Sequence, residues 1–237
     1  ILVKETDIPS GHDPDKYTIE RIKAKSHDGR MIPISLIRLK NIKQNGKSKV
    51  LLYAYGAYKH SVSPSFSASR FCLIDRGITF AIAHIRGGGD LGDEWHVEGK
   101  KKLKKNTFYD YIACANHLID QRYTHKGGVC FYGGSAGGLT GGAVANMAPD
   151  LFFSMLLLVP FVDITTTMLN EKLPLTPGEW EMWGNPIKSK DYFEYILSIK
   201  RIIGNILVFG RKNCWYCASF FVIQKNHQKY FEFQQAP

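Results

Sequence analysis

The sequence predicts an α/β fold in which a mostly parallel sheet lies between layers of helices. The apolar segments 78–84, 129–132 and 155–159 are continuously hydrophobic, which is typical of parallel strands with both faces covered. Segments with the helical spacing of apolar residues alternate with these strands along the chain. A chain of 237 residues can bury one sizeable core, so one α/β domain is expected.

The elements are expected in a regular order along the chain. Residues 1–16 are polar and rich in Pro and Gly, which predicts a linker. Period-two alternation in 17–22, a turn at Asp28-Gly29 and the apolar segment 31–39 predict a β-hairpin. The remaining elements follow in chain order: strand 50–55, helix 66–76, strand 78–84, helix 107–122, strand 129–132, helix 136–147 and strand 155–159.

The chain is basic, but it contains no nucleic-acid-binding motif. Its formal charge is +10, and the lysines and arginines are scattered along the sequence. The densest run, 100–105, is interpreted as a solvated loop or helix face. Nucleic acid is therefore not expected as a partner. The longest apolar stretch, 151–162, is too short to span a bilayer, so no membrane partner is expected.

Cysteine usage gives no sign of a disulfide framework or a metal site. The five cysteines have irregular spacing, and Cys214 and Cys217 form a C-x-x-C motif without a second pair for zinc. No metal or organic cofactor is expected. Lys4 and Glu5 follow only three apolar residues, so no signal peptide is visible and a cytoplasmic location is expected. The chain begins with Ile1 rather than Met, which indicates part of a longer protein.

The segment 132–138, with the sequence YGGSAGG, predicts a catalytic serine. It contains G-x-S-x-G between a predicted strand and a predicted helix, the context of a nucleophile elbow in an α/β-hydrolase fold. The turn is so tight that its flanking positions tolerate almost no side chain, which fits Gly133 and Gly137. Ser135 is therefore the candidate nucleophile, and the backbone N–H of Ala136 is a candidate donor to the oxyanion.

The motifs around Ser135 resemble those of the prolyl oligopeptidase family of serine peptidases, and within it the oligopeptidase B group. The similarity extends from about the first residue to Leu197 in a consistent order and spacing. Its motifs are YAYGAY at 53–58, HIRGGGDLG at 84–92, KKNTF at 104–108, VPFVD at 159–163 and GEWEMWGNP at 178–186.

The resemblance implies roles for further residues. Tyr55 would donate its hydroxyl to the oxyanion beside the Ala136 amide. The family's enzyme cleaves short peptides after Arg or Lys, and Glu179 and Glu181 match the acidic residues held responsible for that preference. A carboxylate in a pocket suits this role, because it pairs with a guanidinium through two parallel hydrogen bonds. Short basic peptides are therefore the expected substrates. At positions where the family often carries acidic residues for the preceding substrate side chain, this chain has Ser63 and Ser65.

The resemblance also implies the domain boundaries. The family places a β-propeller before the hydrolase domain, so residues 1–16 would be the linker from it. Residues 17–210 would form the hydrolase domain, and 211–237 a divergent tail that leaves the C-terminal part of the fold incomplete.

The triad partners of Ser135 are not identifiable. In this fold the acid and the histidine follow the serine in the chain, which rules out His84 and His96. Asn213 stands where the acid is expected, after a possible strand at 206–210, and it carries no charge to stabilise an imidazolium. His227 lies after Ser135 but lacks the glycine-flanked context of the family's histidine. Asp163 is interpreted as a loop-capping carboxylate.

Three functions remain open on these observations. The first is a serine oligopeptidase domain with impaired activity. The second is an inactive remnant or a peptide-binding pseudoenzyme, and the third is a hydrolase of the carboxylesterase or lipase type. The oligomeric state is not predicted. The glycine run 87–89 matches no phosphate-binding loop and is expected to let another loop pass close to the active-site face.

Overall fold

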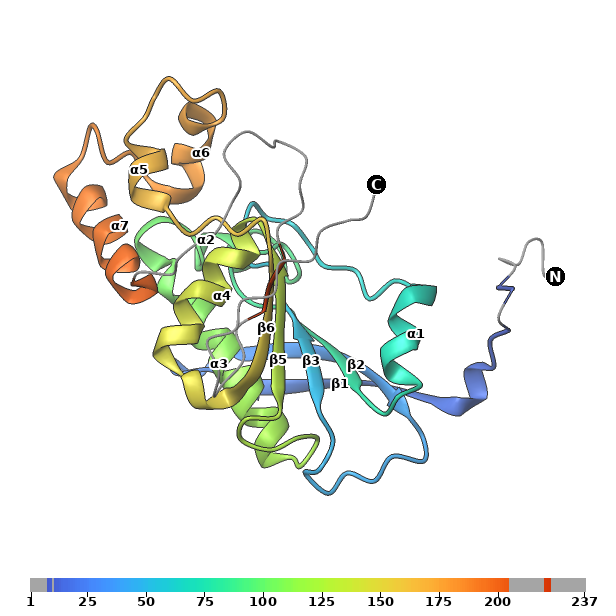
Figure 1. Ribbon diagram of the computed structural model, residues 1–237. Helices are drawn as coiled ribbons and strands as arrows, with labels where there is room; N and C mark the ends of the chain where they lie inside the picture. The colour runs from blue at the N-terminus through green and yellow to red at the C-terminus, as the bar shows by residue number, and fades with distance from the viewer. Residues whose placement is uncertain (1–7, 10, 205–219, 223–237) are drawn as a thin grey trace.

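The computed structural model describes residues 8–9, 11–204 and 220–222, the last three by their backbone only. The described residues form a seven-stranded sheet in the order β1-β2-β4-β3-β5-β6-β7 (Figure 1). The bounds of the strands are β1 (Tyr17–Lys25), β2 (Met31–Leu39), β3 (Val50–Tyr53), β4 (Thr79–Ala83), β5 (Val129–Gly134), β6 (Phe152–Leu158) and β7 (Phe220–Val222).

The strand directions follow the pattern expected from the sequence. The four central strands β4, β3, β5 and β6 are parallel. β1 and β2 form an antiparallel hairpin from the Tyr17–Leu39 pair to the Lys25–Met31 pair, and β2 runs antiparallel to β4. β7 runs antiparallel to β6. The predicted α/β-hydrolase type of sheet, with its N-terminal hairpin, is confirmed.

Helices cover both faces of the sheet (Figure 1). α3 (Lys105–Asp120) and α4 (Ala136–Met147) pack on one face with α7 (Lys190–Ile203) against α4, and α1 (Ala68–Ile74) covers the other. Leu52 belongs to the core on the α3 and α4 side, whereas its neighbour Leu51 packs on the α1 side. Consecutive strand residues are thus buried on opposite faces, which explains the continuous apolar runs. The other helices are α2 (Asp93–Val97), α5 (Ile164–Met168), α6 (Thr176–Trp183) and the 3₁₀ helices η1 (Pro14–Lys16), η2 (Lys101–Leu103) and η3 (Pro149–Leu151).

Most element bounds differ from the sequence prediction by a few residues. β6 begins at Phe152 rather than at 155, because Phe152 already pairs with Val129 of β5. Ser154 is polar but buried within the strand, and its hydroxyl hydrogen-bonds to the Cys130 thiol. β3 ends at Tyr53 rather than at 55, where the chain turns away from the sheet. The possible strand at 206–210 lies outside the described residues.

The basic run 100–105 is not wholly solvated, so that interpretation is wrong for Lys104. This side chain is 0% exposed. It lies where η2 joins α3, and its Nζ donates a hydrogen bond to the Gly56 carbonyl at 2.5 Å. The sequence pattern missed its burial because the partner comes from a loop far away in the chain.

A buried ion pair links the hairpin turn to α3. Asp110 is 0% exposed and Arg86 1%, and Arg86 Nη2 lies 2.7 Å from Asp110 Oδ1. Asp110 also accepts hydrogen bonds from Arg86 Nε at 2.8 Å and from Ser26 Oγ at 2.6 Å. Burial lowers the pKa of Arg86, but its hydrogen bonds to Asp110 and Asp28 more than offset this and raise the pKa overall. Arg86 is therefore charged, and its guanidinium hydrogen-bonds to both Asp110 and Asp28.

Candidate active site

Ser135 lies at the junction of β5 and α4 in a strained backbone conformation. Its φ is 50° and its ψ is −121°, which an L-residue rarely adopts. Three backbone hydrogen bonds of 2.9 Å hold the residue in place. Its N–H donates to the Leu158 carbonyl, and its own carbonyl accepts from the N–H groups of Gly138 and Phe161. The local geometry is that of a nucleophile elbow.

The glycines of the elbow allow neighbouring backbone to approach. A Cβ on Gly137 would lie 2.8 Å from the Ala54 carbonyl oxygen, and one on Gly133 would lie 3.0 Å from the same atom. A Cβ on Gly138 would lie 2.5 Å from the Cα of Pro160. The segment that carries Tyr55 and the chain after β6 thus pack directly on the elbow.

Replacing Gly138 with alanine is expected to destabilise the fold by about 1–3 kcal/mol, because the added methyl group would meet backbone that cannot move freely. Gly178→Ala in α6 is the matched control, since a Cβ there meets no atom within 4 Å. Urea unfolding followed by circular dichroism measures both changes. Equal midpoints for the two variants would contradict the close approach at Gly138.

Tyr55 and Ala136, the two expected oxyanion donors, both lie next to Ser135. The hydroxyl of Tyr55 hydrogen-bonds to the side chain of Ser135. Burial raises the pKa of Tyr55, and the charge of Glu179 adds to this, while the bond to Ser135 acts in the opposite direction. The phenol therefore stays protonated and can donate. The N–H of Ala136 is in the first turn of α4, where backbone donors have no partner within the helix.

Glu179 lies close to this site, whereas Glu181 does not. Glu179 accepts a hydrogen bond from Trp183 Nε1 at 3.2 Å, and it accepts a second one from the Tyr58 hydroxyl. Glu181 comes two positions later in α6 and therefore on a different side of the helix. Its side chain is 84% exposed and pairs with Lys101 at 3.1 Å. The structure thus brings Glu179 together with Tyr55 and leaves Glu181 apart from them.

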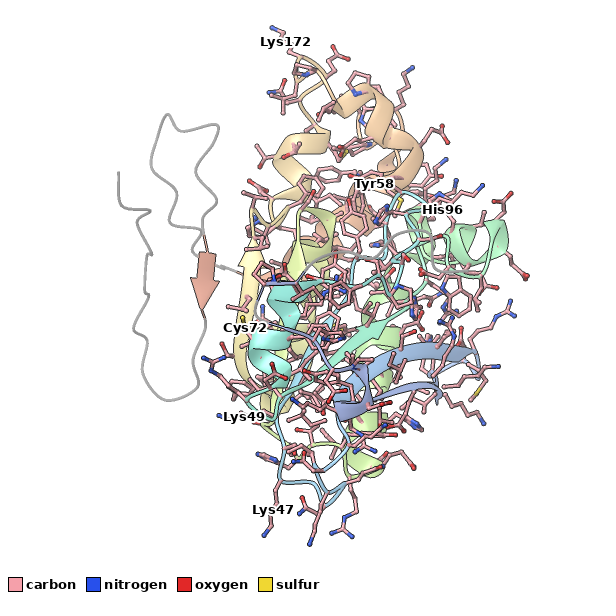
Figure 2. The ribbon with its side chains drawn as sticks, turned by 90° about the vertical axis from the view of Figure 1, so that its right-hand side faces the viewer. Lys47, Lys49, Tyr58, Cys72, His96 and Lys172 are labelled. Atoms are coloured by element: carbon pink, nitrogen blue, oxygen red, sulfur yellow. The ribbon has the colours of Figure 1, made fainter. Side chains whose placement is uncertain are left out.

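Aromatic rings form a wall beside Glu179. The ring of Trp183 lies 5.8 Å from Tyr58 and 5.5 Å from Phe161, and Tyr58 lies 6.4 Å from Tyr55. In Figure 2, Tyr58 lies at the same end of the molecule as His96, and Lys47 lies at the opposite end. Sequence reasoning did not assign Tyr58 or Trp183 to the site. The spacing of Trp183, four residues after Glu179 on one helix face, was the available signal.

The loop after Tyr55 has an unusual backbone. Gly56, Tyr58 and Lys59 have φ values of 72°, 55° and 58°. A Cβ on Gly87 would lie 2.2 Å from the Gly56 carbonyl oxygen, and one on Gly89 would lie 2.3 Å from that of Lys59. The expectation that the glycine run 87–89 lets a loop pass close by is confirmed.

His84 forms a second serine–histidine–aspartate array away from the elbow. Its Nε2 lies 2.9 Å from Ser35 Oγ, and its Nδ1 lies 2.7 Å from Asp90 Oδ1. Ser35 is within β2, with strands on both sides, and its hydroxyl also accepts from Arg21 at 3.0 Å. A serine in mid-strand lacks the helix N-terminus that supplies an oxyanion donor. Because Asp90 accepts from the Val62 N–H at 3.0 Å, the array fastens that loop to the sheet.

The other candidate triad residues take structural roles or lie outside the described residues. His96 Nδ1 is 3.0 Å from the Lys59 N–H and 2.9 Å from the Gly87 carbonyl. Asp163 caps α5 by accepting from Thr166 N–H and pairs with Lys200 at 3.2 Å, which confirms its interpretation as a capping carboxylate. Asn213 and His227 are outside the described residues.

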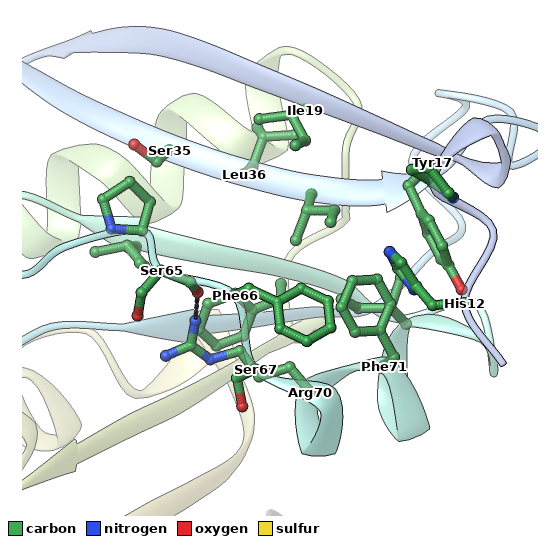
Figure 3. Close-up of a pocket in the computed structure, with 16 residues that line it drawn as sticks. His12, Tyr17, Ile19, Ser35, Leu36, Ser65, Phe66, Ser67, Arg70 and Phe71 are labelled. Carbon is green, nitrogen blue, oxygen red and sulfur yellow. Dashed lines mark hydrogen bonds between the residues drawn. The ribbon is translucent and has the colours of Figure 1, made fainter. Parts of the chain in front are cut away.

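A separate apolar cavity of about 270 Å³ lies between the hairpin and α1 (Figure 3). His12 stacks on Tyr17 at 5.5 Å and meets the edge of Phe71 at 4.6 Å, so the described end of the expected linker packs on the domain. The lining residues include Ser65 and Arg70, but none of Ser135, Tyr55 and Glu179. This cavity is therefore distinct from the elbow site.

No metal-binding or membrane-spanning feature occurs in the part of the chain that the structure describes. Its His, Cys, Asp and Glu side chains form no group of three or more that could hold a metal ion. Within the same residues, no helix has the length and apolar character needed to cross a membrane.

The fold and the elbow define a domain of the α/β-hydrolase class with a serine at its nucleophile position. The model of the prolyl oligopeptidase family matches residues 64–206, and the chain belongs to this family. It is 44% identical over 182 residues to protease 2 of Moraxella lacunata, and 46% identical over 197 residues to dipeptidyl aminopeptidase BI of Pseudoxanthomonas mexicana. These alignments cover 77% and 83% of this chain.

Solved structures show the same relationship. Oligopeptidase B of Leishmania major matches with a TM-score of 0.80 and 44% identity, over 84% of this chain and 28% of that protein. Oligopeptidase B of Trypanosoma brucei, with covalently bound antipain, matches with a TM-score of 0.81 over 85% of this chain. The chain spans 27% and 26% of the length of the two curated relatives.

Proposed function

We propose that the chain acts as a serine oligopeptidase domain that cleaves short peptides after Arg or Lys through an acyl-enzyme on Ser135. The observation that carries this proposal is the position of Glu179. Its carboxylate lies against Tyr58 and Trp183, and its charge acts on Tyr55, which bonds to the nucleophile. A carboxylate that acts on the tyrosine beside the serine elbow suits a cationic side chain next to the scissile bond.

Each group has a role in this reaction. Ser135 Oγ would attack the carbonyl carbon and pass its proton to a base, and the oxyanion would accept hydrogen bonds from Tyr55 and the Ala136 amide. The leaving amine would take the proton, and water would then hydrolyse the acyl-enzyme. The aromatic wall would pack along the aliphatic stem of the substrate's Arg or Lys. His84 and His96 are engaged elsewhere in the fold, and we propose that turnover is slow.

Labelling with a fluorophosphonate and turnover of three substrates test this proposal. We expect slow turnover of a dipeptide amide ending in Arg, no turnover of the Phe analogue or of a simple ester, and slow labelling of the chain. Ser135→Ala should abolish labelling and turnover, because the nucleophile is lost. Ser35→Ala should leave both unchanged, because the Ser35 array fastens a loop.

The other outcomes separate the competing functions. Turnover of the ester alone would support a carboxylesterase or lipase-like hydrolase. A folded chain that neither labels nor turns over any substrate would support an inactive remnant or a peptide-binding pseudoenzyme. Labelling that persists in Ser135→Ala and is lost in Ser35→Ala would overturn the assignment of the nucleophile.

The setting of this activity is also a proposal. We propose a cytoplasmic chain with short basic peptides as its partners, and with neither nucleic acid nor a membrane surface. The scattered basic residues, with no nucleic-acid-binding motif among them, support the part of this setting that leaves out nucleic acid. Fractionation of cells that express the parent gene, with an antibody against this chain, would test it.

A further inference from the structure

Lys104 is a fully buried lysine between the two halves of the candidate site. Its Nζ donates to the Gly56 carbonyl at 2.5 Å and lies 5.4 Å from the centre of the Trp183 ring. Among the described residues, the carboxylate whose charge acts on it is Asp110, which is already paired with Arg86. Burying an amino group without a carboxylate of its own costs free energy. We therefore expect a functional role of this lysine in its two contacts.

The contact with Gly56 restrains the loop that carries the oxyanion tyrosine. Gly56 directly follows Tyr55, and the backbone stays left-handed at Tyr58 and Lys59. A left-handed conformation at a residue other than glycine costs about 1 kcal/mol or more, so contacts from outside the loop must maintain it. Besides the hydrogen bond from Lys104, Lys59 N–H donates to the Gly87 carbonyl at 3.1 Å. The hydrogen bond from Lys104 therefore restrains the residue directly after Tyr55.

The contact with Trp183 acts on the other half of the site. The ammonium group lies over the indole ring, an arrangement that attracts a cation to the ring face. The same indole donates through Nε1 to Glu179 and Tyr58, each at 3.2 Å. One side chain therefore contacts both the oxyanion loop and the residue that orients the acidic group.

We propose that Lys104 is a positioning residue that sets Tyr55 toward Ser135 and holds the Trp183 indole beneath Glu179. The catalytic importance of placing Tyr55 and Trp183 in this way rests on the proposed function. The contacts that Lys104 makes do not depend on it. Burial lowers the pKa of Lys104 to about 7, with the charge of Asp110 acting in the opposite direction. The protonated form is therefore present at and below neutral pH, directly over an intrinsic fluorophore.

The first test is a pH titration of tryptophan fluorescence in the unmodified chain. We expect a transition near pH 7 that disappears in Trp183→Phe and in Lys104→Met, because the charge over the indole changes there. The groups that face Lys104 are Asp110 on α3, Tyr195 on α7, and Glu179 and Tyr58 across the indole. Lys105→Met is the matched control, since Lys105 is the next residue and its Nζ lies 5.2 Å from the Tyr195 ring. It should keep the transition.

The second test measures the site itself. Lys104→Met should slow fluorophosphonate labelling of Ser135 by about 10²-fold, the order expected when a catalytic group moves by about 1 Å, and Lys105→Met should not. It should also weaken binding of benzamidine, a planar amidinium that mimics an arginine side chain. If the unmodified chain does not label at all, the proposed function fails, and the fluorescence and benzamidine results still decide the role of Lys104.

Two results would overturn the role of Lys104. One is a Lys104→Met variant that matches Lys105→Met in labelling rate and benzamidine affinity. The other is an unmodified chain without a fluorescence transition that depends on both Lys104 and Trp183. If Lys104→Met does not fold, Lys104→Gln replaces it in the labelling, benzamidine and fluorescence measurements.

Discussion

Replacing Asp110 with alanine is expected to destabilise the domain by about 3–5 kcal/mol, the cost of leaving a buried charge without its partner. Asp110 is fully buried and accepts from Arg86 Nε, Arg86 Nη2 and Ser26 Oγ. The variant would leave Arg86, which is 1% exposed, with its remaining contacts to Asp28 and Glu98 at the surface. Because these contacts join the hairpin turn to the end of β4 and to α3, their loss should lower the free energy of unfolding of the whole domain.

The matched control removes an exposed carboxylate from the start of another helix. Asp191 in α7 pairs with Lys102 at 2.8 Å, but its side chain is 72% exposed. Asp191→Ala should therefore leave the urea midpoint almost unchanged, because surface ion pairs contribute little. Asp110→Asn keeps one carbonyl acceptor, so its urea midpoint should lie between those of Asp110→Ala and Asp191→Ala. Equal midpoints for Asp110→Ala and Asp191→Ala would show that the buried pair does not stabilise the fold.

The sequence predicted the sheet and the elbow because their signals are local. Continuous apolar runs indicate strands buried on both faces, and G-x-S-x-G between a strand and a helix indicates a sharp turn at Ser135. The structure bears out both features of the backbone. The placement of Tyr55 beside Ser135 came from a family resemblance rather than from periodicity, since nothing in a single loop shows which distant serine it meets.

The features that the sequence did not reveal depend on contacts between distant segments. Lys104 belongs to a basic run and looks solvated, yet it is buried because the Gly56 carbonyl turns toward it. Ser35 is far from His84 and Asp90 in the chain and meets them only when β2 pairs with β4. Glu179 and Glu181 look equivalent in sequence, whereas the helix directs them to different neighbours.

That difference between the two glutamates gives the second large effect. Glu179→Gln is expected to weaken benzamidine binding by about tenfold to a hundredfold, because a hydrogen bond to a charged group contributes about 1.5–3 kcal/mol. Glutamine has nearly the same shape, so the aromatic wall and the bond from Trp183 Nε1 should persist. Isothermal titration calorimetry measures the affinity directly and does not require a working triad.

Glu181→Gln provides the control, since it makes the same chemical change two residues away in the same helix. Glu181 is 84% exposed and bound to Lys101, so its loss should change the affinity by less than about twofold, as expected for a solvent-screened charge. An equal loss in the two variants would mean that both carboxylates bind the cation, and that α6 rearranges to bring Glu181 inward. No loss in Glu179→Gln would remove the basis for a preference for Arg or Lys at this site, and the esterase alternative would then gain support.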